Sequence, residues 1–335
     1  MKGKLASIII PVKKINNYLR KETIPALLRQ TEKNFEILVL TDRESHEKFP
    51  KTRIISTWPK TGPADKRDIG AKEAKGKILA FLDDDSYPDT SWLKNALDVF
   101  KQKKAYAGVC GPSLTPKSDN LSQKASGYVW SSWLGSGGAG NYRATVSPRR
   151  FVDDYPTVNL LVRKNDFWQV GGFESRFWPG EDTKLCNDLV YCLGKKIVYD
   201  PNVVVYHHRR PIFGPHLSQI SRYAIHRGYF ARTFPKTSFR LGYFLPSLFA
   251  LGFISGPLLG IIIKRQHELL SSFVFYSWFF FSALYLILLL ITIAHIYYLE
   301  RRIKLSLLSG LSIFTTHLVY GFLFLKGFFT LHLES

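Results

Sequence analysis

The chain has 335 residues, which suits one large domain or two smaller ones. Its 46 lysines and arginines outnumber 26 acids, so we expect an anionic partner: nucleic acid, a phospholipid surface or a phosphorylated substrate. The first apolar run stops at Pro11, too early for a signal peptide, and predicts a strand. Cys110, Cys186 and Cys192 lack metal-ligand spacing and are odd in number, which indicates reduced thiols in a cytosolic compartment.

Strand and helix patterns alternate over the first 110 residues. Five short apolar runs are expected strands: residues 7–11, 35–40, 53–56, 78–82 and 107–110. Three stretches between them are expected helices: residues 17–31, 62–75 and 92–100. This alternation predicts an α/β domain with a parallel, doubly wound sheet.

The chain changes character at residues 113–150, which are rich in glycine, serine and aromatics. We expect a long loop or a pair of loops there, acting as a lid or binding segment. Residues 155–162 return to a strand pattern, and 183–193 read as a short helix. Two further short strands are expected at 197–199 and 203–206.

The last third of the chain is apolar. Beyond a basic, aromatic bridge at 207–240, three segments have the length that a membrane span requires: residues 243–263, 269–298 and 305–330. Prolines and glycines in the first make a kinked or re-entrant helix the alternative to a full span there. A buried core helix is the other interpretation, but the second segment is too long for it.

Basic residues flank these segments asymmetrically. Five lie between Arg222 and Arg240, and three between Arg301 and Lys304. If the first two segments form a hairpin, both groups and the N-terminal domain lie inside, although Lys264 and Arg265 then fall outside. A membrane location makes lipid or lipid phosphate a better partner than nucleic acid, for which the sequence has no recognisable motif.

Three consecutive carboxylates, Asp83, Asp84 and Asp85, follow the apolar run at 78–82. Ligands of α/β folds bind beyond the carboxyl ends of the strands. The three charges repel one another, so solvent, basic neighbours or a cation must offset them. Oxygen ligands of this kind suit Mg²⁺ or Mn²⁺ shared with substrate phosphates. The alternative is a solvated acidic turn.

Arg67 shares one face of its expected helix with Gly70, Ala71 and Ala74. These small residues let the helix lie close to the sheet. Arg67 would then lie towards the carboxyl end of the Asp83 strand or a bound diphosphate. The alternative is an ordinary surface arginine.

A second acidic pair, Glu181 and Asp182, follows Gly180 at the start of an expected helix. The helix dipole favours carboxylates in a first turn, so capping is one interpretation. A catalytic base held in a shaped cavity is the other.

Two further groups follow. His207 and His208 end a strand and are either metal ligands or ordinary histidines. Gln219, Arg222 and Tyr223 occupy neighbouring positions of one helical turn. An amide, a guanidinium and a ring together suit a sugar–phosphate, and equally a membrane-interface helix.

In this order, the motifs resemble the family 2 glycosyltransferases of the GT-A fold, over about residues 5–230. The matching segments are 7–11, Asp42, 62–63, 67–70, 74–76, 81–85, 170–173 and 180–185. Segments 134–143, 320–322 and 326–327, with Asn159, look like a bacterial subgroup that builds exopolysaccharide repeat units on lipid carriers at the inner membrane.

The resemblance implies a role for each matching position on the donor side. Pro11 and Asp42 would bind the nucleotide, Asp42 through the uracil or ribose. Asp83 and Asp85 would form the D-x-D pair that holds Mg²⁺ or Mn²⁺ on the donor diphosphate. Arg67 would also contact the donor. Asp84 is either structural or a contact to the donor's ribose or sugar.

On the catalytic and acceptor side, the resemblance implies that Asp182 is the general base, with Glu181 beside it. His207 or His208 would complete the metal shell. The motif of Gln219, Arg222 and Tyr223 resembles the Q-x-x-R-W motif of polysaccharide synthases, with tyrosine replacing tryptophan. There the arginine meets the diphosphate and the ring meets the acceptor sugar.

The chain departs from the family pattern at three places. Asp68 stands where asparagine is usual. Lys13 and Lys14 occupy a region that usually carries a polar or acidic residue. The second strand ends in the sequence T-D-R-E-S at 41–45 in place of D-D-G-S. These departures concern the nucleotide contacts and leave the two acidic motifs complete.

The resemblance and the residues together predict a membrane-anchored, inverting glycosyltransferase of polysaccharide and cell-envelope biosynthesis. It would transfer a sugar from a nucleotide-sugar, most simply a UDP-sugar, to a lipid-linked or growing saccharide. We expect a catalytic domain at 1–206, a basic amphipathic interface segment at 207–242 and a membrane domain at 243–335, with the catalytic domain on the cytoplasmic side of the cell (inner) membrane.

Three alternatives remain open. One is transfer to polyprenyl phosphate itself. Another is a processive polysaccharide synthase, although three membrane segments are few for a translocation channel and Tyr223 replaces the usual tryptophan. The non-enzymatic alternative is a membrane scaffold with a degenerate transferase domain.

Overall fold

The computed structural model describes residues 4–59, 61–138 and 140–333. The chain divides into two compact units, the first containing Met1–Lys117 and Tyr142–His208 and the second Ser118–Asn141 and Arg209–Leu333. Residues 1–3 and 334–335, which belong to the expected first and last domains, lie outside the described residues. The expected functional division into a catalytic domain at 1–206, an interface segment at 207–242 and a membrane domain at 243–335 stays a prediction.

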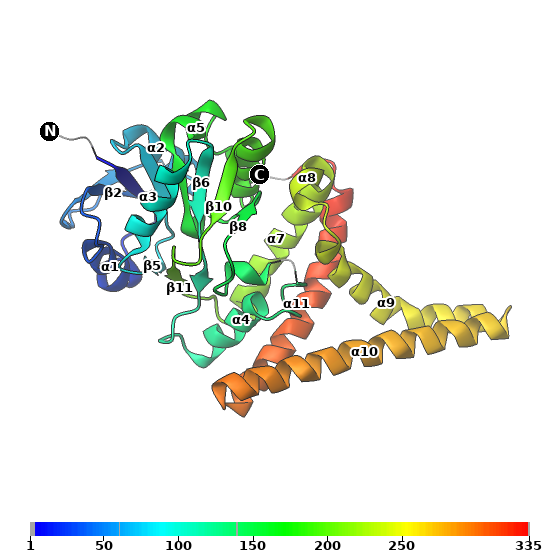
Figure 1. The fold of residues 1–335 in the computed structure, drawn as a ribbon. Coiled ribbons are helices and arrows are strands. Elements are labelled where there is room, and N and C mark those ends of the chain that lie inside the picture. The colour runs from blue at the N-terminus through cyan, green and yellow to red at the C-terminus, as the bar shows by residue number, and fades with distance from the viewer. Residues whose placement is uncertain (1–3, 60, 139, 334–335) are drawn as a thin grey trace. The chain divides into compact units, whose positions relative to one another are not determined.

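The first unit is built on an eight-stranded sheet with the order β3-β2-β1-β4-β9-β6-β10-β8. Figure 1 labels four strands of this sheet, β2, β6, β8 and β10. Neighbours among the first four of these strands run parallel, as do β6 and β10, whereas β9 and β8 are antiparallel to their neighbours. The predicted α/β fold with a mostly parallel sheet is confirmed. The strands are β1 (Ala6–Pro11), β2 (Phe35–Thr41), β3 (Thr52–Ser56), β4 (Ile78–Phe81), β6 (Tyr106–Cys110), β8 (Arg150–Val152), β9 (Leu160–Arg163) and β10 (Lys196–Tyr199).

Helices cover both faces of this sheet. Successive strand residues point to opposite faces, so Ile8 and Ile10 of β1 join one apolar cluster while Ile9 joins the other. The first cluster includes residues of α1 (Ile24–Leu28) and α3 (Trp92–Gln102). The second includes residues of α2 (Pro63–Glu73), α5 (Lys164–Gln169) and α6 (Glu181–Asn187).

A small second sheet lies beyond the acidic triplet. It has the order β5-β11-β7, formed by β5 (Ser86–Pro88), β11 (Val205–His207) and β7 (Ser113–Leu114). β5 begins directly after Asp85, so this sheet fixes where the end of the triplet lies.

The prediction that residues 113–150 form only loops is wrong. The segment contains helix α4 (Leu121–Ser131) and a short 3-10 helix at Asn141–Arg143. A capping box starts α4: the Asn120 side chain accepts from the Gln123 backbone N–H, and the Gln123 side chain accepts from that of Asn120. This local signal starts a helix although the segment is rich in glycine and serine. The glycine-rich part that follows the helix forms turns at 133–138.

The expected strand at 155–162 is also shorter than predicted. Pro156 precedes a 3-10 helix at Thr157–Asn159, and β9 begins only at Leu160. The Asn159 side chain donates to the backbone oxygens of Gly111 and Val203, each at 2.7 Å. These bonds satisfy a buried amide that would otherwise need another partner.

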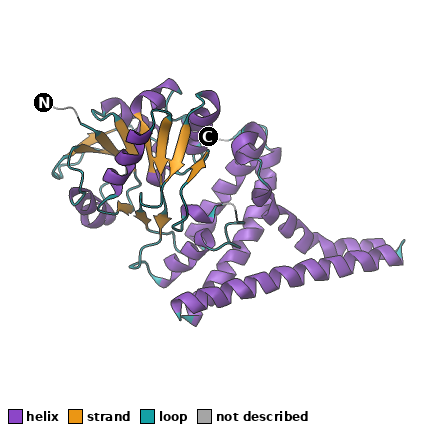
Figure 2. Cartoon of the chain, in the orientation of Figure 1, coloured by secondary structure: helices purple, strands orange, loops and turns teal. Residues whose placement is uncertain are grey.

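The second unit consists of helices (Figure 2). Among the described residues, three helices are long and apolar enough to cross a membrane, judged by length and composition: α9 (Leu241–Lys264), α10 (Glu268–Glu300) and α11 (Ile303–Phe329). Pro246 and Pro257 lie inside α9, which nevertheless stays one continuous helix. The unit also contains α4, α7 (Gly214–Thr233) and α8 (Pro235–Ser238).

Helices α7 and α11 touch through glycines. A Cβ at Gly327 of α11 would lie 1.9 Å from the carbonyl oxygen of Ile225, and one at Gly228 of α7 would lie 2.0 Å from that of Phe324. Small residues allow this close backbone approach, as in packed membrane helices. The basic helix α7 is therefore held directly against the third candidate span.

Candidate metal and nucleotide site

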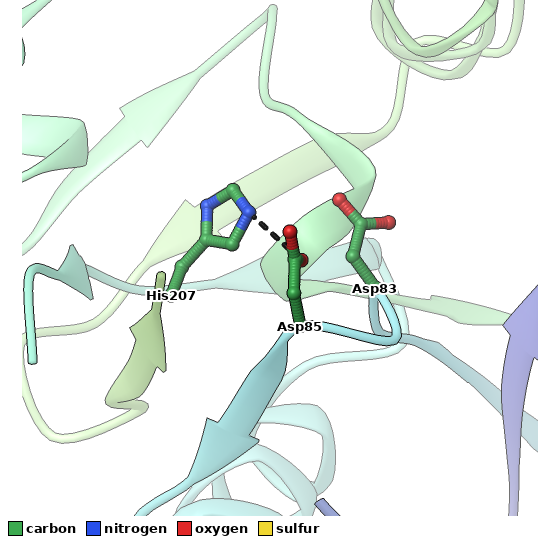
Figure 3. A group of neighbouring side chains, drawn as sticks. All are labelled: Asp83, Asp85 and His207. Atoms are coloured by element: carbon green, nitrogen blue, oxygen red, sulfur yellow. Dashed lines mark ion pairs between the residues drawn. The ribbon is translucent and has the colours of Figure 1, made fainter. Parts of the chain in front are cut away.

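The structure brings together Asp83, Asp85 and His207. One ligand atom from each lies within 4.8 Å of the others, and His207 Nε2 is 3.1 Å from Asp85 Oδ1 (Figure 3). All three side chains are partly exposed, so a ligand can reach them. Two carboxylates and an imidazole form a donor set of oxygen and nitrogen, which fits Mg²⁺ or Mn²⁺.

Strand pairing explains why a histidine so distant in sequence joins the two aspartates. In the antiparallel pair of β5 and β11, His207 lies opposite Ser86, the residue after Asp85. Tyr87 and Tyr206 lie directly opposite each other with stacked rings 5.1 Å apart. Cross-strand aromatic pairs stabilise one register. That register sets His207 beside Asp85.

His208 has a different environment. Its Nε2 is 3.0 Å from Glu22 Oε2, and its ring stacks on Tyr18 with centroids 4.3 Å apart. The side chain is buried. Of the two histidines that the sequence left as candidates, His207 is the one that lies with Asp83 and Asp85.

Arg67 joins the two acidic motifs. Its guanidinium donates to Asp83 Oδ1 at 2.9 Å and to Glu181 Oε1 at 2.8 Å, and the side chain is buried. A Cβ at Gly70 would lie only 2.6 Å from Ile9 Cγ2, so the small face of α2 lies close to the sheet. Burial lowers the pKa of Arg67, but the charges of Asp83 and Glu181 outweigh it and raise the pKa overall.

The two carboxylates at the start of α6 differ in their environments. Glu181 is buried against Arg67, and burial raises its pKa even though the guanidinium opposes the shift. Asp182 is half-buried, and its Oδ1 accepts from the Thr183 backbone N–H at 2.8 Å. Glu181 is therefore held by Arg67, while Asp182 is the more exposed of the two carboxylates.

Asp84 is held within the protein. Its Oδ2 accepts from the Asn16 side chain at 2.5 Å. Burial, followed by the charges of Asp85 and Asp83, raises the pKa of Asp84 to about 7. This contact fits the structural interpretation of Asp84 better than direct contact with the donor.

The expected nucleotide contacts lie at the ends of β1 and β2. Pro11 is the last residue of β1, and Asp42 directly follows β2. Lys66 on α2 reaches both strand ends: its Nζ is 2.5 Å from Asp42 Oδ1 and 2.7 Å from the carbonyl oxygen of Val12. Sequence patterns alone did not point to Lys66 or Asn16. Only the sequence neighbours of Lys66 in the Gly62–Gly70 motif indicated that region.

The three helical candidates lie together on α7, in the second unit. Gln219 Nε2 donates to the Tyr223 hydroxyl at 3.2 Å, and the Tyr223 ring meets Trp130 edge-on with centroids 6.3 Å apart. Arg222 lies on the same helix, between Gln219 and Tyr223 in sequence. Their part in a reaction stays a prediction.

The first unit thus combines a mostly parallel α/β sheet with Asp83, Asp85 and His207 beyond the end of β4. Two family models match the chain. The one described as Glycosyl transferase family 2 covers residues 7–136, and the one described as Glycosyl transferase family group 2 covers residues 78–326, well over half of the chain. The chain belongs to the family 2 glycosyltransferases.

Curated relatives agree with this family. The pre-mycofactocin glycosyltransferase of Mycobacterium tuberculosis is 28% identical over 153 residues, covering 44% of this chain and 30% of the relative. An uncharacterized glycosyltransferase of Haemophilus influenzae is 35% identical over 109 residues, covering 29% and 35%. The Escherichia coli UDP-Glc:alpha-D-GlcNAc-diphosphoundecaprenol beta-1,3-glucosyltransferase WfaP is 32% identical over 93 residues, covering 25% and 37%. The matches thus span about a third of these relatives' length.

A solved structure shows the same fold. It is the mannosyltransferase PcManGT from Pyrobaculum calidifontis in complex with GDP-Man and Mn²⁺, with a TM-score of 0.58 and 13% identity. The match covers 94% of this chain and 88% of that chain. The predicted GT-A fold is confirmed.

Proposed function

We propose that this chain is a membrane-anchored, metal-dependent, inverting glycosyltransferase that moves a sugar from a nucleotide-sugar to a lipid-linked or growing saccharide. The observation that carries the proposal is one connected group. Asp83 and Asp85 lie with His207, and Arg67 connects Asp83 to Glu181 beside Asp182. Under this proposal residues 1–206 are catalytic, 207–242 form the membrane interface, and 243–335 form the membrane domain.

The donor half of the reaction needs charge compensation for a leaving nucleoside diphosphate. Asp83, Asp85 and His207 would hold Mg²⁺ or Mn²⁺, which when bound supplies electrostatic stabilisation to the diphosphate. Pro11 and Asp42 would bind the nucleoside part at the neighbouring strand ends. The name of the E. coli relative, which acts with UDP-Glc, supports a UDP-sugar as donor.

The acceptor half needs a base that removes a proton from the attacking hydroxyl. Asp182 is the more exposed of the two carboxylates at the start of α6 and would act as this base, and Glu181 is ion-paired with Arg67. A hydroxyl activated on the face opposite the leaving group displaces the diphosphate directly, and this inverts the anomeric centre. A positioned base of this kind contributes roughly 10²–10⁴-fold in rate.

The acceptor is proposed to be a lipid-linked saccharide at the cytoplasmic face of the inner membrane. Three candidate spans support membrane attachment. The name of the E. coli relative, which includes a diphosphoundecaprenol-linked acceptor, supports a lipid carrier. Gln219, Arg222 and Tyr223 on α7 are proposed to bind sugar–phosphate groups.

A screen of radiolabelled nucleotide-sugars with membranes that contain the protein, plus Mn²⁺, tests the proposal. We expect label in the lipid extract with one donor, and none in matched membranes that contain the Asp182→Asn variant. Mass spectrometry of the product separates the outcomes: one added sugar on a saccharide supports the proposal. A sugar on polyprenyl phosphate or a long polymer supports the alternative enzymes, and absence of transfer from every donor supports a scaffold.

A further inference from the structure

Lys66 is a buried cation at the edge where a nucleoside is proposed to bind. Its side chain is 3% exposed, and its ammonium lies between Asp42 Oδ1 at 2.5 Å and the Val12 carbonyl oxygen at 2.7 Å. Lysines are almost never buried unless they are paired. The ammonium therefore ties α2 to the ends of β1 and β2 at the position of Asp42.

This pairing changes what Asp42 can offer a ligand. Asp42 Oδ1 is buried and faces the ammonium, while the side chain as a whole is 17% exposed. The Asp42 backbone N–H donates to the Lys13 carbonyl oxygen at 3.1 Å, which fixes the residue further. Among the described residues, no hydrogen bond engages Oδ2. Lys66 Nζ donates one hydrogen bond, to the Val12 carbonyl oxygen, and is ion-paired with Asp42 Oδ1. A ligand at this place would meet Asp42 Oδ2 and, beside it, an ammonium that has further N–H groups.

We propose that Lys66 makes the nucleotide site selective for uridine over guanosine, an inference that rests on the proposed function. The exposed edge of uracil has one N–H between two carbonyl oxygens. The N–H matches the single oxygen of Asp42, and a flanking carbonyl matches the ammonium of Lys66. Guanine presents two adjacent N–H donors, which need both oxygens of a carboxylate. At Asp42 one of these oxygens, Oδ1, is already ion-paired with Lys66.

The spacing along the sheet edge suits a nucleoside diphosphate. Asp42 follows β2 and Asp83 follows β4, and β1 lies between these strands. Two strand spacings separate them by roughly 10 Å. The base would therefore lie at Asp42 while the diphosphate lies at the carboxylates.

An exposed aromatic ring lies next to the same edge. Trp58 follows β3, the neighbour of β2, and its side chain is 67% exposed. The Arg43 guanidinium lies 5.5 Å from the centre of the indole. Stacking of a base on an aromatic side chain is sequence-tolerant, because every base has a flat face. Trp58 would add affinity, and the pair of Asp42 and Lys66 would add selectivity.

Calorimetric binding of UDP, CDP, GDP and ADP to the purified full chain with Mn²⁺ tests the inference. We expect UDP to bind at least about tenfold more tightly than the other three, because one mismatched hydrogen bond to a charged group has about that effect. CDP is informative because cytosine has an acceptor where uracil has the N–H. GDP is the essential rival, since the solved structure of similar fold contains GDP-Man.

A matched pair of variants tests the role of Lys66 itself. Lys66→Met keeps the length of the side chain and removes the charge, whereas Lys72→Met makes the same change at an exposed position of the same helix. We expect Lys66→Met to weaken UDP binding by about tenfold or more and to reduce the preference over GDP. We expect Lys72→Met to bind as the unaltered chain does.

The outcomes separate the two proposals. Equal or tighter binding of GDP by the unaltered chain overturns the selectivity inference and leaves the glycosyltransferase proposal standing. Unchanged selectivity in a folded Lys66→Met variant also overturns it. If that variant does not fold, the relative affinities of UDP, CDP, GDP and ADP for the unaltered chain decide whether the selectivity inference stands. If no nucleoside diphosphate binds with Mn²⁺ present, the proposed function itself is wrong.

Discussion

At the scale of single residues, Asp68 shows how a departure from the family pattern is accommodated. Its Oδ1 accepts from the Phe173 backbone N–H at 3.0 Å and lies beside Gly172, whose φ is +80°. A Cβ at Gly172 would come within 2.9 Å of that oxygen. The carboxylate therefore caps the Gly-Gly turn. Burial raises the pKa of Asp68 to about 6.

Replacing Asp68 with asparagine should stabilise the first unit at neutral pH. The amide oxygen can still accept from Phe173, and it carries no charge. The native carboxyl has a reference pKa of 3.8 and a folded pKa of about 6, so its charge destabilises the fold fully above pH 6 and not at all below 3.8. After allowance for solvent screening, we expect a gain of about 1–2 kcal/mol at pH values above about 7.

Thermal unfolding followed by tryptophan fluorescence between about pH 4 and pH 8 measures this effect. The advantage of Asp68→Asn should shrink as pH falls through about 6 and vanish near the reference pKa of 3.8. A variant that is equally stable or less stable above neutral pH would show that the native carboxylate is favourable there.

Asp182 carries the prediction about the chemical step. Asp182→Asn should reduce transfer by roughly 10²–10⁴-fold, because the amide cannot accept the proton of the acceptor hydroxyl. Donor binding should change little, since Asp83 and Asp85, the carboxylates proposed to bind the metal, are unaltered. Initial rates and calorimetric UDP binding on the same preparation separate the two effects, and an unchanged rate would remove Asp182 from the mechanism.

The residue types of the site were largely predictable from the sequence, but their connections were not. The acidic triplet and the position of Arg67 followed from strand-end and helix-face patterns. The pair of Lys66 and Asp42 depends on how closely α2 approaches β1 and β2. The choice between His207 and His208 depends on the register of two three-residue strands, which no local pattern specifies.

At the scale of elements, the close contact of α7 with α11 can be tested by a glycine-to-alanine substitution, which adds one methyl group to the interface. Gly327→Ala would place a Cβ 1.9 Å from the Ile225 carbonyl oxygen, which is backbone and cannot move aside alone. We expect the helical unit to lose about 1–3 kcal/mol of stability.

Gly252→Ala in α9 is the matched control. No atom lies within 4 Å of the position that a Cβ would take there, and alanine favours a helix more than glycine does. Thermal unfolding in detergent should therefore show a lower midpoint for Gly327→Ala and an equal or higher midpoint for Gly252→Ala. Equal midpoints for Gly327→Ala and the unaltered chain would refute the close helix contact.

Element types were predicted best where periodicity was long or strand runs were apolar. The three C-terminal segments correspond to α9, α10 and α11, with ends that differ by a few residues. Helix α4 was missed because glycine and serine content outweighed its capping box in the interpretation of 113–150. The start of β9 was misplaced because the apolar pattern continues through a 3-10 turn.

At the scale of the whole molecule, the change in hydropathy along the chain agrees with its division into two compact units. Three candidate spans lie in the second unit, whereas the acidic group and Asp182 lie in the first. The segment Ser118–Asn141 is the exception, because it leaves the first unit and belongs to the helical one. Composition alone could not assign this segment, since His317 of α11, whose Nε2 is 3.4 Å from the Gly135 carbonyl oxygen, is 182 residues away in sequence.

The measurement that tests the central claim most directly is nucleotide release from nucleotide-sugars by the purified full chain, with and without a divalent metal. We expect turnover of one donor with Mn²⁺ or Mg²⁺, loss of turnover in EDTA, and recovery when the metal is returned. Asp85→Asn should not recover, because one metal ligand is missing. Undiminished turnover in EDTA, or equal turnover by Asp85→Asn, would contradict the role assigned to Asp83, Asp85 and His207.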